Sequence, residues 1–329
     1  MKNGGKFVIS LDFELYWGCR DDKSIDEYGA NILGVSEIMP VMLDLFDSYQ
    51  VDATFATVGL LFASTKEELI RFSPKEKPNY DDHNLSPYNG HFDLVKASEA
   101  EDKYHYASRL IQMIQKRKHH EIGTHTFSHY YCLEKGQTVA DFQRDIEAAV
   151  QIAKIRNVEI KSLAFPKNQI NPEYLRVCLE NGITSYRGNQ KAWFYKAAKT
   201  ESETLLKKVC RMADVYVNLS GHNCATLEEI AQCRPFNIPA SRFLRPYSPI
   251  LKPLEGLRLM RVKDGMSFAA RNNLVYHVWW HPHNFGIFQK ENLSLLKKVL
   301  AHYQFLKKQY QFQSITMGGL AEQLENANG

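Results

Sequence analysis

The segment His120-Glu121-Ile122-Gly123-Thr124-His125-Thr126-Phe127-Ser128-His129 places two histidines, His125 and His129, four positions apart after a short apolar step. Side chains at positions i and i+4 share one face of a helical turn, so both imidazoles can converge on one metal ion. Two histidines supply half of a tetrahedral zinc site, and a catalytic site adds a third protein ligand and a water. Because paired histidines also occur on solvated helix faces, this motif indicates a metal centre only together with a third ligand.

The composition is that of an ordinary globular protein. The chain has 329 residues, of which 44% are apolar and 24% are charged, so it can bury a sizeable core. A net charge of +4 does not indicate a nucleic-acid partner, although it suits an anionic small substrate. The six cysteines are scattered without a Cys-x-x-Cys pair, which indicates free thiols in a reducing compartment.

The first residues, Met1 to Lys6, lead straight into a strand-like segment without the apolar core and cleavage site of a signal peptide. The chain has no run of about 18 apolar residues that would span a bilayer. We therefore expect a cytoplasmic protein with no integral membrane segment and no nucleic-acid partner.

Two carboxylates follow the first predicted strand. The segment Phe7 to Glu14 begins as an apolar run and ends with Asp12 and Glu14, as a buried parallel strand does at a catalytic face. Residues two apart in an extended chain point to the same side, and two buried carboxylates are costly unless a cation meets them. The alternative is that these acids merely begin a loop.

Predicted strands and helices alternate along the chain. Strands are expected at residues 53–58, 162–166, 183–187 and 274–280, with helical patterns between them, which indicates a parallel α/β architecture. Without repeats or a flexible linker, residues 1–329 are expected to form one domain, in which 74–99 and 188–273 are insertions or extended loops. The first of these is either a loop that covers a substrate or an inert surface excursion.

Reactive side chains follow three of the predicted strands. These are Asp12 and Glu14, the pair His125 and His129, and the late pair His281 and His283. In parallel α/β barrels the reactive groups lie on loops after the carboxyl ends of strands. A carboxylate and two histidines leave a metal position open for water, and the remaining acid and histidine would act as general base and general acid.

Several motifs together resemble the polysaccharide deacetylase superfamily, with its carbohydrate esterase family 4 and NodB homology domain. The motif from Glu121 to His129 carries this resemblance most specifically. Further similar motifs, spread over nearly the whole chain, are Ser10–Glu14, Ala53–Phe55, Phe165–Pro166, His281 and Thr316–Leu320.

The resemblance implies a distorted, incomplete (β/α)7 TIM-like barrel with insertions, and a metal-dependent N-deacetylase of amino sugars. It implies Zn²⁺ or another divalent ion as cofactor. Carried over to this sequence, it makes Asp12 the catalytic base and His281 the general acid, with Glu14, His125 and His129 as the metal ligands.

The sequence departs from the commoner family pattern at two places. Phe13 separates an aspartate from a glutamate where many members have adjacent aspartates, which leaves the division of roles between Asp12 and Glu14 open. Ala164 stands where an arginine usually precedes the proline, so Lys167 or Arg187 is expected to supply the missing charge. The candidate substrate-binding residues are Trp17, Lys167, Arg187 and His283. An alternative for His283 is that it supports the neighbouring residues of the site.

The expected partner is an amino-sugar-containing small molecule or glycan. A cytoplasmic location favours a nucleotide- or lipid-linked intermediate of bacterial surface polysaccharide biosynthesis, such as O-antigen (lipopolysaccharide) or capsule. Two alternatives stay open: a hydrolase of another amide, such as an N-formyl group or a cyclic ureide, and a catalytically inactive carbohydrate-binding relative. The alanine at position 164, where an arginine is usual, is the main support for the inactive relative.

Overall fold

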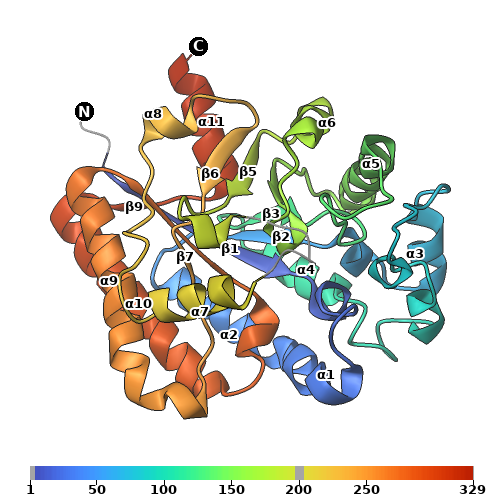
Figure 1. The fold of residues 1–329 in the computed structure, drawn as a ribbon, viewed down its shortest axis with the longest axis horizontal. Helices are drawn as coiled ribbons and strands as arrows, with labels where there is room; N and C mark the ends of the chain where they lie inside the picture. Colours follow the sequence, from blue (N-terminus) through green and yellow to red (C-terminus); the bar gives the residue numbers. More distant parts are fainter. Residues whose placement is uncertain (1–3, 197–203, 329) are drawn as a thin grey trace.

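The computed structural model describes residues 4–196 and 204–328. Its sheet is made of parallel strands, and helices surround them (Figure 1). The strands are β1 (Lys6–Phe13), β2 (Thr54–Thr57), β3 (Glu121–Thr124), β4 (Ser162–Ala164), β5 (Ser185–Gly188), β6 (Phe236–Pro239), β7 (Arg242–Phe243), β8 (Val275–Trp280) and β9 (Gln313–Ser314).

The sheet curls into a ring with seven strand positions. Its order is β6-β5-β4-β3-β2-β1-β8-β7, and the short β9 pairs with β1 beside this path. Strands β6 and β7 lie at the two ends of the order, yet only two residues separate them. The amide of Ala240 donates to Gly188 O of β5 at 2.8 Å, and the amide of Ser241 donates to His277 O of β8 at 2.7 Å. One bent segment therefore joins both ends, which confirms the distorted, incomplete (β/α)7 barrel.

The helices follow the strands in the alternation that the sequence predicts. Short 3-10 helices come directly after β1, β4 and β8: η1 (Leu15–Gly18), η5 (Pro166–Asn168) and η10 (Pro282–Phe285). The α-helices are α1 (Ile25–Leu33), α2 (Val35–Ser48), α3 (Lys66–Phe72), α4 (Ser108–Gln115), α5 (Val139–Ile155), α6 (Leu175–Glu180), α7 (Leu205–Asp214), α8 (Leu227–Ile230), α9 (Glu255–Asn272), α10 (Gln289–Tyr310) and α11 (Met317–Asn328).

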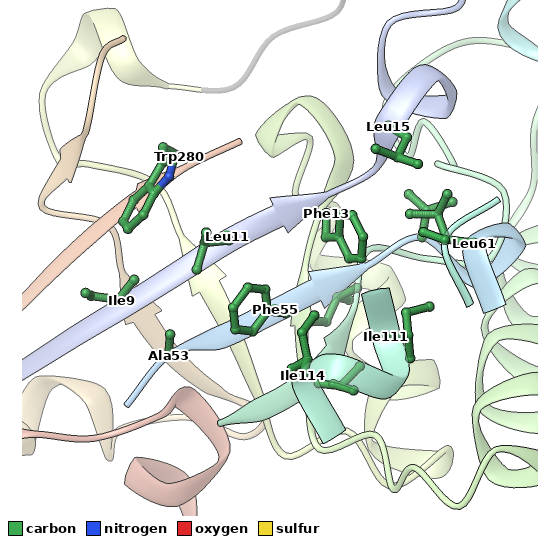
Figure 2. Close-up of a cluster of buried hydrophobic side chains, with 14 of the residues drawn as sticks. Ile9, Leu11, Phe13, Leu15, Ala53, Phe55, Leu61, Ile111, Ile114 and Trp280 are labelled. Carbon is green, nitrogen blue, oxygen red and sulfur yellow. The ribbon is translucent and has the colours of Figure 1, made fainter. Parts of the chain in front are cut away.

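The central strand β1 is buried on both faces, and its side chains alternate between two environments. Ile9, Leu11 and Phe13 belong to the large core between the strands and the helices, where they lie near Phe55 of β2 (Figure 2). The intervening side chains face the inside of the barrel. Alternation along one strand therefore separates the apolar core from a polar interior at the carboxyl end.

The structure corrects the description of residues 188–273 as an insertion or extended loop. This region contributes β6, β7 and the long helix α9 to the barrel. Strands of four and two residues are too short to show a periodicity, which is why the pattern was not evident. Residues 197–203, within that region, lie outside the described residues.

The excursion at residues 74–99 packs onto the protein. It contains two short 3-10 helices, η3 (His83–Leu85) and η4 (His91–Leu94), and buries Tyr80, Leu85 and Val95. That this excursion covers a substrate stays a prediction. The assignment of residues 1–329 to one domain also stays a prediction.

One helical stretch in the described residues, Ile25–Ser48, is long and apolar enough to cross a membrane by composition. It is divided at Gly34 into α1 and α2, and it contains Pro40. Its most apolar window is 56% buried inside the protein. Packing of α2 side chains such as Ile38 and Phe46 into the core accounts for this hydrophobicity.

Candidate metal centre

The site lies where β1, β3 and β8 end. Strand β1 pairs with β8 on one side and with β2 on the other, and β2 pairs with β3, all in parallel. The carboxyl ends of these strands therefore meet at one end of the barrel, where they bring together Asp12, Glu14, His125, His129 and His281.

Three of these side chains form a compact group of potential metal ligands. Glu14 Oε2 lies 3.1 Å from His125 Nε2 and 3.2 Å from His129 Nε2. The ligand atoms of the three residues lie within 4.8 Å of one another, and all three residues are buried. One oxygen and two nitrogen donors, without a fourth protein ligand in this group, fit the donor set of a catalytic zinc site.

The orientation of His125 supports this use. Its Nδ1 lies 2.7 Å from the carbonyl oxygen of Ala164. Because a carbonyl only accepts hydrogen bonds, Nδ1 carries the proton, and Nε2 of the neutral ring presents a lone pair toward Glu14. Metal-binding histidines are oriented in this way. The backbone at position 164 therefore has a role in the site although its side chain is only a methyl group.

A second group of possible ligands lies outside the barrel end and fits a metal less well. It consists of Asp47, His119 and His120, of which Asp47 and His119 are exposed. The backbone amide of Ala53 donates to His120 Nδ1 at 3.2 Å, so Nε2 of the neutral ring carries the proton and cannot coordinate. Asp47 is also paired with Arg117 at 2.8 Å. This group is better described as a surface ion-pair cluster.

The segment from His125 to His129 is a loop that follows directly after β3. Thr126 and His129 have left-handed φ values of 63° and 57°, and these conformations turn the two imidazoles together. Such strained residues persist where their surroundings hold them. Here the Tyr130 amide donates to Thr126 Oγ1 at 2.7 Å.

Asp145 of α5 is a functional candidate that the sequence analysis missed. Its carboxylate accepts hydrogen bonds from the Phe127 amide at 2.7 Å, from the Ser128 amide at 3.2 Å and from the Ser128 hydroxyl. It therefore holds the loop that carries both histidines. The available signal was an aspartate next to Ile146 on the apolar face of an amphipathic helix, where an unpaired acid is costly.

Asp12 is paired with Arg187 of β5. The guanidinium donates from Nη1 to Asp12 Oδ1 at 2.5 Å and from Nη2 to Asp12 Oδ2 at 2.7 Å. Arg187 also contacts Ser10 Oγ at 3.2 Å, and its guanidinium carbon lies 4.1 Å from the centre of the Trp279 ring. Of the two cations that the sequence left open, Arg187 is thus the one beside Asp12. Its full burial makes it a partner of Asp12 and not a direct contact to substrate.

The charges of the site hold its carboxylates ionised. Burial opposes the ionisation of Asp12, but the nearby Arg187 guanidinium outweighs it and keeps the pKa below its usual value. Burial also opposes the ionisation of Glu14, and the adjacent histidines His281, His125 and His129 hold its pKa well below the usual range. Asp12 is therefore available as a proton acceptor at neutral pH.

His281 faces both carboxylates from β8. Its Nε2 lies 3.7 Å from Asp12 Oδ2 and 3.6 Å from Glu14 Oε1, and the side chain is 23% exposed. The Asn284 amide donates to His281 Nδ1 at 3.1 Å, while Tyr28 donates its hydroxyl to Asn284 Oδ1 at 3.0 Å. These contacts orient the ring so that Nε2 faces the site.

His283 lies behind His281, with the two rings stacked at a centroid distance of 5.0 Å. Burial, followed by the charge of His281, lowers its pKa to about 3, so it is neutral at physiological pH. Its Nε2 is 3.9 Å from Glu14 Oε1. This placement favours the interpretation of His283 as a support for the two groups in front of it.

The structure buries Trp17 away from the site cavity, whereas Lys167 lines that cavity. Trp17 is fully buried and donates its indole N–H to His105 O at 2.8 Å, so it cannot stack on a sugar. Trp17 belongs to η1, whose first residue, Leu15, has a left-handed φ of 47°. Lys167 forms an ion pair with Asp21 and borders the site cavity.

The site opens into a cavity of about 310 Å³. Asp12, Glu14, His129 and His281 line it. Lys167, Trp279, Asn284 and His283 form further parts of its wall. Polar groups thus converge beside the rings of Tyr28 and Trp279 in a concave site, which is typical of a small-molecule site.

Comparison with known proteins agrees with this geometry. The sequence model of the family "Polysaccharide deacetylase" matches residues 21–186, just over half of the chain. The chain therefore belongs to the polysaccharide deacetylase family, and this membership assigns it to the deacetylase hydrolases. The matched region contains His125 and His129, while Asp12, Glu14 and His281 lie outside it. A comparison with curated protein sequences finds no match.

Three solved structures show the same fold. One is described as a polysaccharide deacetylase from Mycobacterium smegmatis (TM-score 0.59, 12% identity, covering 100% of this chain and 93% of that one). Another is described as a polysaccharide deacetylase from Pseudomonas aeruginosa PAO1 (TM-score 0.51, 10% identity, 98% and 90% covered). The third is the allantoinase Puue (TM-score 0.51, 10% identity, 98% and 89% covered). At these identities the similarity concerns the fold alone.

Proposed function

We propose that the chain is a metal-dependent hydrolase that removes an N-acetyl group from an amino sugar. The proposed substrate is a nucleotide- or lipid-linked intermediate of bacterial surface polysaccharide biosynthesis, and the proposed location is the cytoplasm. The observation that carries the proposal is the grouping of Glu14, His125 and His129 directly beside an ionised Asp12 and the Nε2 of His281.

Glu14, His125 and His129 would hold a divalent ion, and their mixed oxygen and nitrogen donors suit zinc. When bound, this ion would act as a Lewis acid toward the carbonyl oxygen of the amide. The roles of Asp12 and Glu14, left open by the sequence, differ in the geometry. Glu14 faces both imidazoles, whereas Arg187 occupies both oxygens of Asp12.

The remaining groups would move the protons. Asp12 takes a proton from the attacking water as the new carbon–oxygen bond forms, and Arg187 keeps this carboxylate ionised until then. His281, in its imidazolium form, donates the Nε2 proton to the departing nitrogen as the carbon–nitrogen bond breaks. The products are acetate and a protonated amino sugar, and the proton on Asp12 returns to His281, so atoms and charge balance with one water consumed.

The two alternative functions differ from this proposal in measurable ways. A catalytically inactive relative is disfavoured because the acid, the base and all three ligand side chains are present and lie together at one end of the barrel. A hydrolase of an N-formyl group or a cyclic ureide would use the same grouping on another amide. Only the product released distinguishes it from a deacetylase.

The experiment is an acetate-release assay of the zinc-loaded protein over N-acetylated sugars in nucleotide-linked, polyprenyl-phosphate-linked and free form, with N-formyl sugars and cyclic ureides as alternatives. We expect Asp12→Asn and His281→Ala to lower kcat by about 10²- to 10⁴-fold, the range of general acid–base catalysis. Both variants should keep the wild-type metal content. The double variant His125→Ala/His129→Ala should lose the metal.

Near-normal turnover in Asp12→Asn or His281→Ala would reject the role given to that residue. Release of formate or opening of a ureide, without acetate from any sugar, would replace the proposed reaction by the alternative. A wild-type protein without metal after metal-replete purification would reject the metal-dependent mechanism.

A further inference from the structure

A second and larger cavity adjoins the metal centre. Its volume is about 670 Å³, and it lies among α7, β7 and the 3-10 helix η7 (Trp193–Tyr195). Lys167, Asn168 and Trp279 line both this cavity and the cavity of the metal centre. A substrate whose amide reaches the metal ligands can therefore extend past these three residues into the second cavity.

The second cavity is strongly cationic. None of its described lining residues is an aspartate or a glutamate. Its basic side chains are Lys167, Lys196, Lys208, Arg211, Arg242 and Arg245. Such a concentration of one charge in a concave site attracts anions.

Arg242 shows that the cavity is a built site and not only a basic surface. Its side chain is 4% exposed, and its Nη1 donates to Asp214 O at 2.9 Å and to Asp214 Oδ2 at 3.2 Å. Its Nε and Nη2 atoms are buried and lack a hydrogen-bond partner in the part of the chain that the structure describes. Asp214 thus holds Arg242 in place, and the buried guanidinium contributes a fixed positive charge to the cavity wall.

The buried carboxylate behind Arg242 does not neutralise the cluster. Asp214 is shared between Arg242 and Arg261, which lies 3.4 Å away, and it also accepts the Tyr195 hydroxyl at 3.0 Å. One negative charge thus faces two arginines. Asp214 orients Arg242 and Tyr195 toward the cavity wall, and a positive excess remains.

Arg245 adds a second guanidinium on the same loop. The described residues provide neither an ion pair nor a hydrogen bond to its side chain, and burial together with the charge of Arg211 lowers its pKa. Like charges are thus held close in a partly desolvated site. Planar guanidinium groups match the oxygens of phosphate in a two-pronged arrangement. The aromatic rings of Tyr195, Phe243 and Trp279 provide flat surfaces beside them.

We infer that this cavity binds the phosphate or diphosphate group of a substrate whose acylated amino sugar occupies the adjoining metal centre. The inference rests on the proposed function for the identity of the sugar. The binding of phosphate itself requires only Arg242, Arg245 and Lys208 with their neighbours. Nucleotide-linked and polyprenyl-linked sugars both carry a phosphate ester on the sugar. The inference concerns this phosphate group, which either carrier would supply.

Calorimetric titration of the full-length, metal-free protein tests the inference without contributions from metal–phosphate contacts. The probes are uridine diphosphate, inorganic diphosphate and a polyprenyl monophosphate in neutral detergent, with free N-acetylglucosamine as the uncharged control. The test variant is Lys208→Gln/Arg245→Gln. The matched control is Lys297→Gln/Lys298→Gln, which removes two lysines from a groove along α10.

We expect the phosphate probes to bind more tightly than the free sugar, and the test variant to weaken this binding by about tenfold or more. The control variant should bind like the wild type. Tighter binding of uridine diphosphate would identify a nucleotide carrier, and tighter binding of the polyprenyl phosphate a lipid carrier. Equal losses in the two double variants, or no binding of any phosphate probe, would overturn the inference.

Kinetics separate the inference from the proposed function. With zinc-loaded protein, the test variant should lower kcat/KM for a phosphate-linked N-acetyl sugar by about tenfold. It should leave the rate on a free N-acetyl sugar unchanged, because the metal centre is intact. Equal effects on both substrates would overturn the phosphate subsite. Phosphate binding with no acetate release from any sugar would reject the deacetylase proposal and leave the subsite standing.

Discussion

Arg187 on β5 holds both carboxylate oxygens of Asp12 at the end of β1, across the interior of the barrel and 175 positions away in the sequence. Strands β4, β3 and β2 separate these two in the sheet order. In a flat sheet, four strand spacings of about 4.8 Å would keep them roughly 19 Å apart. The contact exists because the sheet curls, so the protonation state of the proposed base depends on the closure of the barrel.

Replacement of Arg187 is expected to change the pH dependence of catalysis. In Arg187→Gln, burial raises the pKa of Asp12 against the weaker effects of His125 and His281 alone, so a larger fraction of the base is protonated at neutral pH. The acid limb of the kcat/KM profile should move to higher pH, and Arg187→Lys should move it less. A profile with an unchanged acid limb in Arg187→Gln would show that Asp12 is not the titrating base.

Asp145→Asn is expected to weaken metal binding without removing a ligand. The change leaves a single acceptor oxygen for the Phe127 amide and the Ser128 donors, so the loop between His125 and His129 loses part of its support. Replacing groups that orient ligands typically costs about 10- to 100-fold in metal affinity. Competition with a chromophoric chelator measures this affinity.

Asp141→Asn on the same helix is the control. Asp141 pairs with the helix N-cap Thr138, so its loss should cost about 1 kcal/mol of stability and leave metal affinity unchanged. Equal metal affinities of Asp145→Asn and the wild type would contradict the role of Asp145.

Metal removal is expected to lower the thermal stability. An ion that binds the folded state at Glu14, His125 and His129 stabilises it by RT ln(1 + [L]/Kd), about 2.7 kcal/mol at a hundredfold excess over Kd. Chelation should therefore lower Tm, and added zinc should restore it. His125→Ala should abolish this response, whereas His119→Ala should keep it. If His119→Ala instead abolished the effect of zinc on Tm, the metal would be assigned to the surface cluster of Asp47, His119 and His120.

Acid is expected to destabilise the fold through His277. This side chain is fully buried, and burial, followed by the charge of Arg187, lowers its pKa from 6.5 to about 3. The unfolded chain therefore binds a proton below about pH 6.5 that the folded protein binds only near pH 3. The stability that neutral His277 contributes is complete above pH 6.5 and is lost as the pH falls toward 3.

Between pH 7.5 and pH 5 this one group should cost about 2 kcal/mol, since each pH unit below 6.5 contributes about 1.36 kcal/mol. Urea unfolding of the wild type and of His277→Gln at the two pH values measures it. The variant, which keeps hydrogen-bonding groups but does not titrate, should lose less stability. Parallel losses would assign the acid sensitivity to other groups.

Patterns of neighbouring residues were sufficient to predict the fold class and to name the candidate residues of the site. Alternation and strand-end polarity depend on neighbouring residues only, so the pattern around Asp12 and Glu14 indicated a buried strand that ends at a reactive face. The spacing of His125 and His129 indicated that the two side chains could bind one metal ion. Trp17, a candidate substrate-binding residue from the sequence, is instead buried in the core, where its indole N–H donates to His105 O.

The sequence by itself thus determined the parallel α/β alternation, the family and the candidate ligands, because each is written in residues close together in the chain. Only the tertiary structure decided that Arg187 pairs with Asp12, that Asp145 holds the histidine loop, and that the basic residues of the second cavity gather beside the metal centre. These contacts join elements distant in sequence. Their distances depend on the curvature of the sheet and on the bent segment between β6 and β7, which periodicity along the chain does not encode.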